Sequence, residues 1–149
     1  MMLALLQRFR EERAGSTALE FTLVAGPLLL LMFGVLEFGR AEWSRQTLQE
    51  VAMHGARCMG VRQSACATGD ASDLTKTRSY LMQEGHGYGL SLTTSDITLE
   101  ADATCDGVSG FSRVSLTYDF KSSMPGAIEV LVQELPLRAS ACFPNQPTS

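Results

Sequence analysis

The side chains of this 149-residue chain that could do chemistry are a carboxylate inside an apolar segment, four cysteines and two histidines. The carboxylate is Glu20, and the histidines are His54 and His86. No pair of cysteines has zinc-finger spacing, and two histidines add little to the inventory of metal ligands. The sequence contains no G-x-S-x-G, H-E-x-x-H or Walker motif. We therefore expect no catalytic residues, no metal site, no cofactor and no enzymatic activity.

The four cysteines, Cys58, Cys66, Cys105 and Cys142, all follow the apolar segment. An even number of cysteines on one side of this segment indicates disulfides in an oxidising compartment. Four cysteines permit three connectivities. We favour Cys58–Cys66, which closes a short loop, together with Cys105–Cys142, which ties two strand ends. Because Cys105 is in phase with the buried face of its strand and Cys142 is out of phase, the second bond requires a bulge or a frayed strand end.

Glu20 lies in the segment around which the chain is organised, residues 18–36. These residues read ALEFTLVAGPLLLLMFGVL and carry no other charge. As a helix they would extend about 28 Å, close to the hydrocarbon thickness of a bilayer. No polar face interrupts residues 23–36, so we predict a membrane-spanning helix. Pro27 removes a backbone donor in the middle of the segment and predicts a kink.

Residues 1–15 form a short leader, in which Arg8, Arg10 and Arg13 come just before the apolar segment. Because orientation in the membrane follows the distribution of Lys and Arg, the leader favours a cytoplasmic N-terminus. A secretory signal would have a small-x-small cleavage site after its apolar core. Here the small residues precede the core, at 14–16, so a cut there would leave the membrane helix on the mature protein.

Beyond the apolar segment, an apolar stripe continues at helical spacing. Its members are Leu48, Val51, Ala52, Gly55, Ala56 and Met59. We expect this stripe to pack on the protein's own small domain; the alternative is a stripe reserved for a partner helix. Trp43 is a candidate anchoring aromatic near the outer interface of the membrane.

A loop and a second, short helix are expected next. Residues 58–70 are rich in Gly, Ser and Ala and predict the loop. The helix is expected to begin at a cap on Asp70 or Ser72 and to stop at Gly85. The glycine-rich run at 85–89 lacks the strand and helix that flank a phosphate-binding loop, so we interpret it as a flexible turn.

Three strands are expected in the last third of the chain. Alternating apolar and polar residues predict strands at 97–104 and 114–120, joined by a hairpin loop at 106–110. A third strand at 135–143 would close a small antiparallel meander with one buried face. Residues 144–149 are expected to form a flexible tail. The segments between strands two and three are a predicted turn at 122–126 and a stretch that fits either helix or strand at 127–134.

The residues around Glu20 resemble a class III prepilin signal, with an arginine-bearing leader, Gly15, then Glu20-Phe21 and an unbroken apolar helix. The continuation LEFGRAEWSRQTLQEVAMHGARC is similar to the TadE-like family of minor pilins from tight-adherence (Flp) pilus systems. The resemblance covers about residues 8–60. It implies that a prepilin peptidase cuts at the Gly15–Ser16 junction. It also implies that Glu20 and Phe21 act in recognition and assembly, with Glu20 paired to the new amino group on Ser16 of a neighbouring subunit.

These features predict an α+β, pilin-like fold. A long N-terminal helix at 16–60, membrane-embedded in its first half and amphipathic in its second, precedes a short helix and a small antiparallel β-sheet in a periplasmic domain at 61–143. The formal net charge of −4 excludes nucleic acid as a partner, since phosphate binding needs a basic surface.

The resemblance implies a minor pilin or pseudopilin that initiates, tips or regulates a tight-adherence pilus. Such a protein is expected in the bacterial inner membrane as a single-pass protein. Its expected partners are a prepilin peptidase, other pilin and minor pilin subunits, the inner-membrane pilus assembly platform and the lipid bilayer. The alternative is an unprocessed single-pass membrane protein with a disulfide-stabilised periplasmic binding domain.

Overall fold

The computed structural model describes residues 14–122 and 135–147. The chain divides into two compact units, Met1–Gly39 and Arg40–Ser149. Some predictions concern residues outside the described ranges: most of the leader at 1–13, the turn at 123–126, the helix-or-strand segment at 127–134 and the last tail residues at 148–149.

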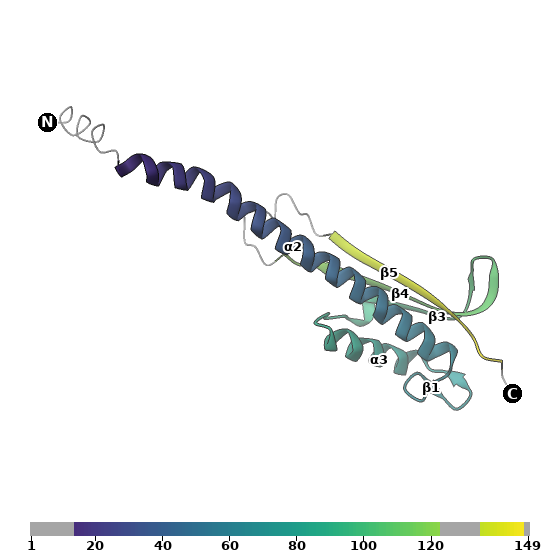
Figure 1. The fold of residues 1–149 in the computed structure, drawn as a ribbon. Coiled ribbons are helices and arrows are strands. Elements are labelled where there is room, and N and C mark those ends of the chain that lie inside the picture. The colour runs from purple at the N-terminus through teal and green to yellow at the C-terminus, as the bar shows by residue number, and fades with distance from the viewer. Residues whose placement is uncertain (1–13, 123–134, 148–149) are drawn as a thin grey trace. The chain divides into compact units, whose positions relative to one another are not determined.

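The described elements confirm the α+β class, with two α-helices and antiparallel sheets (Figure 1). Helix α2 spans Ala14–Gly60 and helix α3 spans Leu74–Gly87. A 3-10 turn, η1, covers Thr94–Asp96 and leads into the main sheet. The strands are β1 (Ala67–Thr68), β2 (Ala71–Ser72), β3 (Ile97–Cys105), β4 (Val108–Phe120) and β5 (Leu135–Pro144).

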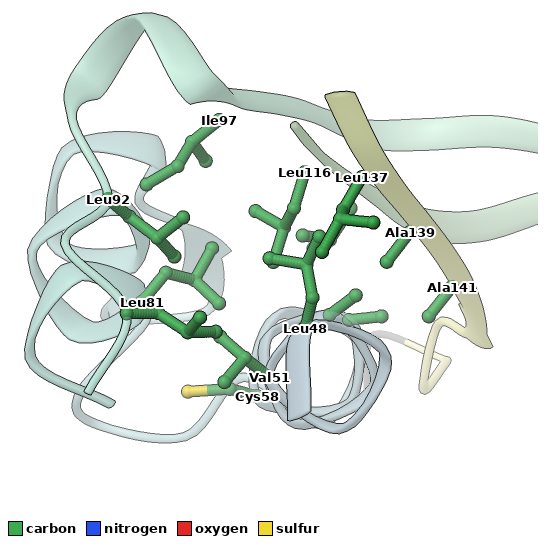
Figure 2. Packing of buried hydrophobic residues seen from close by; sticks show 14 of the residues in the cluster. Leu48, Val51, Cys58, Leu81, Leu92, Ile97, Leu116, Leu137, Ala139 and Ala141 are labelled. Atoms are coloured by element: carbon green, nitrogen blue, oxygen red, sulfur yellow. The ribbon is translucent and has the colours of Figure 1, made fainter. Parts of the chain in front are cut away.

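The apolar stripe on the second half of α2 forms the centre of the hydrophobic core. Leu48, Val51 and Met59 are completely buried, and the other members of the stripe are buried as well. Leu48 and Val51 belong to one buried cluster with Leu81 of α3 and Leu116 of β4 (Figure 2). The stripe therefore packs on the protein's own domain, as expected, and is not left open for a partner helix.

A glycine in the stripe sets the close approach of α3 to α2. A Cβ atom added at Gly55 would lie 2.5 Å from Cδ2 of Leu81, which is itself completely buried. Real Cβ atoms do not come this close to another carbon. The helix tolerates Gly55, despite its backbone entropy, because the missing side chain lets Leu81 reach the core.

Leu48→Ala is expected to lower the free energy of unfolding by about 2 to 5 kcal/mol, because it leaves a cavity in the completely buried core. Met53→Ala on the same helix is the matched control, since Met53 is 57% exposed. Its effect should stay within about 0.5 kcal/mol. Denaturant unfolding of the full chain in detergent measures both values. Equal effects of the two substitutions would contradict the burial of this stripe.

A short hairpin follows α2 where a plain loop was predicted. Strands β1 and β2 pair antiparallel, with Ala67 opposite Ser72 and Thr68 opposite Ala71. The amide of Asp73 donates to the carbonyl of Cys66 at 2.8 Å, which closes the hairpin. These few backbone pairs order a segment whose small, polar composition carried no strand signal.

Helix α3 begins and ends later than predicted. Its N-cap is Asp73, not Asp70 or Ser72, because the Asp73 carboxylate accepts hydrogen bonds from the amides of Thr75 and Lys76, at 3.0 and 3.1 Å. The Lys76 amide, followed by the Thr68 hydroxyl, lowers the pKa of Asp73 from its ordinary value of 3.8. The charged form of the cap is thus the one that these donors stabilise.

Gly85 does not stop α3, and the run at 85–89 is not a flexible turn throughout. The helix continues to Gly87, and Gly85 is buried against Leu92, whose Cδ1 atom would lie 2.9 Å from an added Cβ. The amides of Tyr88 and Leu90 donate to the Gly85 carbonyl. The left-handed residue comes at Gly89, with φ of 81°. Gly85 lets Leu92 pack closely against α3, and the local sequence does not distinguish such a packing glycine from a helix stop.

The main sheet has the order β3-β4-β5, antiparallel throughout, as predicted. Its inner face carries the alternating apolar residues of each strand, such as Ile97, Leu116 and Ala139, which lie opposite one another. The β3–β4 turn is shorter than the predicted loop, because Asp106 and Gly107 alone form it. Both have positive φ, 51° and 81°, as in the two-residue turns that match the twist of a hairpin.

A register shift in β3 changes which face its last residues occupy. Leu99 pairs with Val114 and Glu100 with Arg113, but the next pair is Ala103 with Phe111. Phe111 alternates with the inward-facing residues of β4 and so lies on the outer face. Because directly opposed residues share a face, Ala103 lies on the outer face too. Ala103 is thus buried without joining the core cluster. The predicted alternation of buried and exposed residues holds along the whole strand, although Ala103, after the shift, is buried outside the core cluster.

The beginning of the predicted tail is held by hydrogen bonds. The amide of Asn145 donates to Gly110 and the amide of Gln146 to Gly60, at 2.9 and 3.0 Å. The side-chain amide of Asn145 donates to the Ala101 carbonyl at 2.8 Å, and its oxygen accepts from the completely buried Ser112 hydroxyl at 2.6 Å. The expectation of a flexible tail from residue 144 is thus wrong for these two residues.

Candidate functional site

The first half of α2 is apolar, and among the residues that the structure describes its large apolar side chains are exposed. An 18-residue window of this helix has a mean hydropathy of 2.1, and none of it is buried. Every large apolar side chain from Leu19 to Phe38 is at least 48% exposed. By length and composition the helix can cross a membrane. A continuous apolar surface of this size indicates contact with lipid or with other apolar helices.

The predicted cleavage and assembly residues lie together at the start of this helix. The backbone of Gly15 and Ser16 is in the first turn of α2, and Glu20 and Phe21 follow in the next turn, both exposed. Ser16 and Glu20 are four residues apart, which puts them on one face and about 6 Å apart along the axis. A new amino group on Ser16 would thus begin within reach of a carboxylate, either of its own chain or of a neighbour.

Thr22 is a polar residue of this segment that the sequence reasoning did not use. Its hydroxyl donates to the carbonyl of Ala18 at 2.7 Å. Such a bond satisfies the hydroxyl proton inside the helix, so that it needs no partner in lipid. The signal was available in the sequence, since a threonine four residues after any helical residue can make this bond.

Pro27 lies inside α2, and the backbone is helical on both sides of it. As proline has no amide proton, it cannot donate to the carbonyl of the residue four positions earlier. The kink predicted at this position stays a prediction. Trp43 is 68% exposed on the same helix, and its role as a membrane anchor likewise stays a prediction.

In the part of the chain that the structure describes, no three or more His, Cys, Asp or Glu side chains lie together in a group that could hold a metal ion. His54 has a partner that the sequence did not reveal: its Nδ1 lies 3.8 Å from Oε2 of Glu84, on α3. Burial, and then the neighbouring Glu84 carboxylate, raise the pKa of Tyr80. The His54–Glu84 contact links the two helices of the domain, whereas Tyr80 and Glu84 both lie on α3.

Both favoured disulfides are present. Cys58 and Cys66 have their Cα atoms 5.7 Å apart, and Cys105 and Cys142 have theirs 6.6 Å apart. The second bond depends on the register shift in β3, which brings Cys105 to the face of Cys142. This is the bulge that the sequence argument required. All four cysteines are thus paired in the domain that follows the apolar segment.

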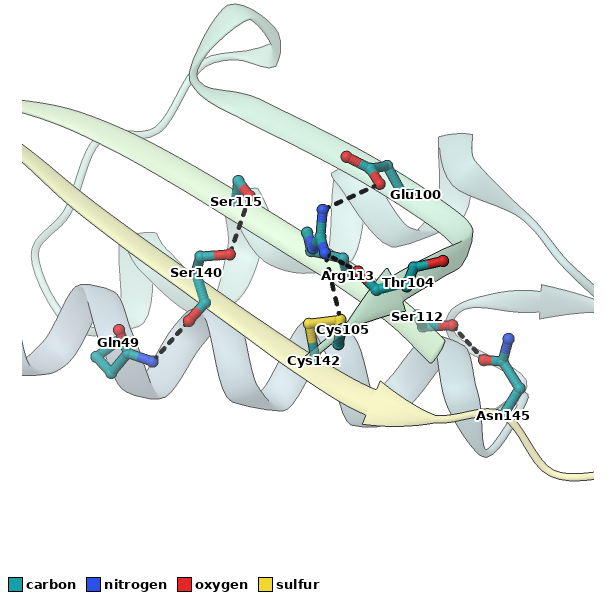
Figure 3. The surroundings of a disulfide bond; sticks show 10 residues. All are labelled: Gln49, Glu100, Thr104, Cys105, Ser112, Arg113, Ser115, Ser140, Cys142 and Asn145. Carbon is teal, nitrogen blue, oxygen red and sulfur yellow. Dashed lines mark hydrogen bonds and ion pairs between the residues drawn. A yellow bond between two sulfur atoms is a disulfide. The ribbon is translucent and has the colours of Figure 1, made fainter. Parts of the chain in front are cut away.

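Two residues that support this domain escaped the sequence analysis. Arg113 lies on the same face as Cys142, directly opposite it in the register, with a guanidinium nitrogen 3.5 Å from Sγ of Cys105 (Figure 3). Asn145 connects β3, β4 and the tail through the bonds given above. Neither has a sequence signal, because their partners are far away along the chain.

The comparisons with known proteins concern helix α2. Residues 15–57 match a protein family described as TadE-like protein. The match begins at the predicted cleavage glycine, contains the exposed apolar segment and ends within the buried stripe. No curated protein and no solved structure matches the chain. Over this segment the chain is similar to TadE-like proteins, and together the match and the apolar helix support a membrane protein associated with a tight-adherence pilus.

Proposed function

We propose that this protein is a minor pilin or pseudopilin of a tight-adherence pilus, cut after Gly15 and assembled through its apolar N-terminal helix. The observation that carries the proposal is the exposed apolar half of α2, because it coincides with the TadE-like match that starts at Gly15. It initiates, tips or regulates the pilus and has no chemistry of its own.

Assembly uses the two halves of α2 differently. The apolar stripe of the second half is buried in the core of its own domain. The first half keeps its apolar side chains free for lipid before assembly and for the helices of other subunits afterwards. Between lipid and a helix bundle the gain comes from packing and polar pairing, since both environments are apolar. Glu20 and the new Ser16 amine supply the polar pair.

The proposed orientation in the membrane follows from the charge of the leader and from the oxidised state of the cysteines. The arginines of the leader favour a cytoplasmic N-terminus, where a prepilin peptidase of the inner membrane would meet the Gly15–Ser16 bond. The two disulfides support a domain on the periplasmic side. The partners are this peptidase, other pilin subunits, the assembly platform in the inner membrane and the bilayer.

N-terminal sequencing of the membrane-extracted protein tests the proposal. With the matching prepilin peptidase co-expressed, the mature chain is expected to begin at Ser16, and intact mass should show loss of the leader. Without the peptidase the chain should keep Met1, which is the matched control. A chain that keeps Met1 in both samples would contradict the proposal and favour the unprocessed membrane protein with a periplasmic binding domain.

A further inference from the structure

The two disulfides differ in their access to solvent. Cys58 and Cys66 are 1% and 0% exposed, within the hydrophobic core. Cys105 is 7% exposed and lies outside the core cluster, while Cys142 is exposed on the outer face of the sheet. Exchange with an external thiolate requires access to a sulfur atom. Only the second disulfide offers that access without unfolding of the domain.

A fixed positive charge lies beside this disulfide. One guanidinium nitrogen of Arg113 lies 3.5 Å from Cys105 Sγ and also donates to the carbonyl of Thr104. The other nitrogen lies 3.4 Å from Oε2 of Glu100 (Figure 3). Glu100, Arg113 and Cys142 lie opposite one another on three neighbouring strands, so the guanidinium is held over the outer face. It contacts the less exposed of the two sulfur atoms.

We propose that the Cys105–Cys142 disulfide is a site of thiol–disulfide exchange, attacked by an external thiolate at Cys142, with Arg113 stabilising Cys105 as the departing thiolate. The reductant is a dithiol, either a small molecule or a protein with two cysteines. The buried Cys58–Cys66 disulfide takes no part. This inference does not depend on the pilin assignment.

The exchange balances in two steps. The attacking sulfur forms a bond to Cys142 Sγ, the Cys142–Cys105 bond breaks, and Cys105 takes the electron pair as a thiolate. A proton from solvent can then convert that thiolate to a thiol. The second thiolate of the reductant attacks its own sulfur in the mixed disulfide and releases Cys142. Two protein thiols form, and the dithiol becomes a disulfide. Positive charge beside the leaving sulfur favours the first step because it stabilises the thiolate.

Other contacts hold β5 in the domain when the Cys105–Cys142 disulfide is reduced. Strand β5 keeps ten residue pairs with β4. It is also tied to α2, because Gln49 Nε2 donates to the carbonyl of Ser140 at 3.0 Å. Asn145 continues to join the end of β5 to β3 and β4. Reduction is therefore expected to free the end of β3 while the core remains packed.

The first test measures the order of reduction. The full chain in detergent is treated with dithiothreitol at native pH, free thiols are trapped by alkylation over time, and peptide mapping follows each disulfide. Cys105–Cys142 is expected to open while Cys58–Cys66 remains closed. Reduction of both at one rate would mean that global unfolding limits the reaction, and would overturn the proposal. Earlier reduction of the buried pair would also overturn it.

The second test identifies the sulfur that is attacked. Glutathione replaces dithiothreitol, since it leaves a mixed disulfide, and rapid trapping with methyl methanethiosulfonate labels the released sulfur. Mass spectrometry is expected to find glutathione on Cys142 and the trapping group on Cys105. Glutathione on Cys105 would overturn the direction of attack and with it the role of Arg113.

The third test removes the charge. An adjacent opposite charge changes a thiol's pKa by about 1 to 3, so Arg113→Gln should slow opening of Cys105–Cys142 roughly 3- to 30-fold. Arg113→Lys should retain most of the rate. Arg138→Gln, an exposed arginine of β5, is the matched control and should leave the rate unchanged. An unchanged slow rate for Cys58–Cys66 would report an intact fold, and an unchanged Cys105–Cys142 rate in Arg113→Gln would overturn the role of the arginine.

Discussion

Glu20→Ala is expected to abolish incorporation of the protein into pili and to leave its membrane insertion intact or improved. A carboxylate in the centre of a membrane helix costs about 2.5 to 3.5 kcal/mol on insertion scales, and less near the interface, so its removal favours insertion. Assembly has the opposite requirement. In a filament the amine on Ser16 of one subunit would be buried against Glu20 of another. Removal of one partner from such a buried pair costs about 3 to 5 kcal/mol.

The measurement compares sheared pili with the membrane fraction, in cells that carry the variant as their only copy. Glu20→Asp should be intermediate, because its carboxylate reaches less far. Glu50→Ala is the matched control, since it removes an exposed carboxylate from the second half of the same helix. Its incorporation should stay at the native level. Cleavage must be followed in the same samples, because lost processing would imitate lost assembly.

One outcome would show that Glu20 lies near the membrane interface without a role in assembly, instead of pairing with the Ser16 amine of another subunit. If Glu20→Ala is cleaved normally and enters pili at the native level, the carboxylate makes no contact on which assembly depends. The helical geometry sharpens this test: Ser16 and Glu20 lie on one face of α2, so a pair within one chain is also within reach. Only a pair between chains selects the register of neighbouring subunits.

Gly15→Val is expected to block cleavage completely and thereby to retain the leader. The reason is steric, because the branched side chain would place bulk at the bond that the peptidase must reach. Intact mass of the membrane-extracted protein, with the peptidase co-expressed, measures the outcome. The variant should keep Met1 and remain in the membrane, since its apolar segment is unchanged.

Gly34→Val provides the matched control for this substitution. Gly34 lies in the same helix, and an added Cβ there would meet no atom within 4 Å. Cleavage of Gly34→Val should equal that of the unchanged chain. If Gly15→Val is still cut before Ser16, the residue at this position does not define the junction. Loss of cleavage in both variants would point to a general effect of valine on the helix.

Much of the first half of the molecule follows from the sequence alone, for a local reason. The apolar segment at 18–36 needs no distant partner to be recognised, because its length and composition already match a bilayer. The stripe from Leu48 to Met59 is also local information, since helical spacing puts its members on one face before any contact forms. The alternation at the start of β3 has the same basis.

Where elements begin and end was decided by tertiary contacts. Asp70, Ser72 and Asp73 are all suitable caps, and the β1–β2 hairpin leaves Asp73 as the one whose carboxylate meets free amides. Gly85 has the sequence of a helix stop, but Leu92 packs where its side chain would be. The tail residue Asn145 is held by groups on β3 and β4 that lie more than 30 positions away.

The disulfides show most clearly what the sequence determined and what the tertiary structure determined. The sequence predicted that four cysteines pair and left three connectivities. The preferred second bond was possible only with an irregularity that no residue type indicated. The register shift between Glu100 and Ala103 supplies it and moves Cys105 to the face of Cys142 and Arg113. Composition and periodicity depend on neighbours in the chain, whereas the distance between two sulfur atoms and a guanidinium depends on how three strands pair.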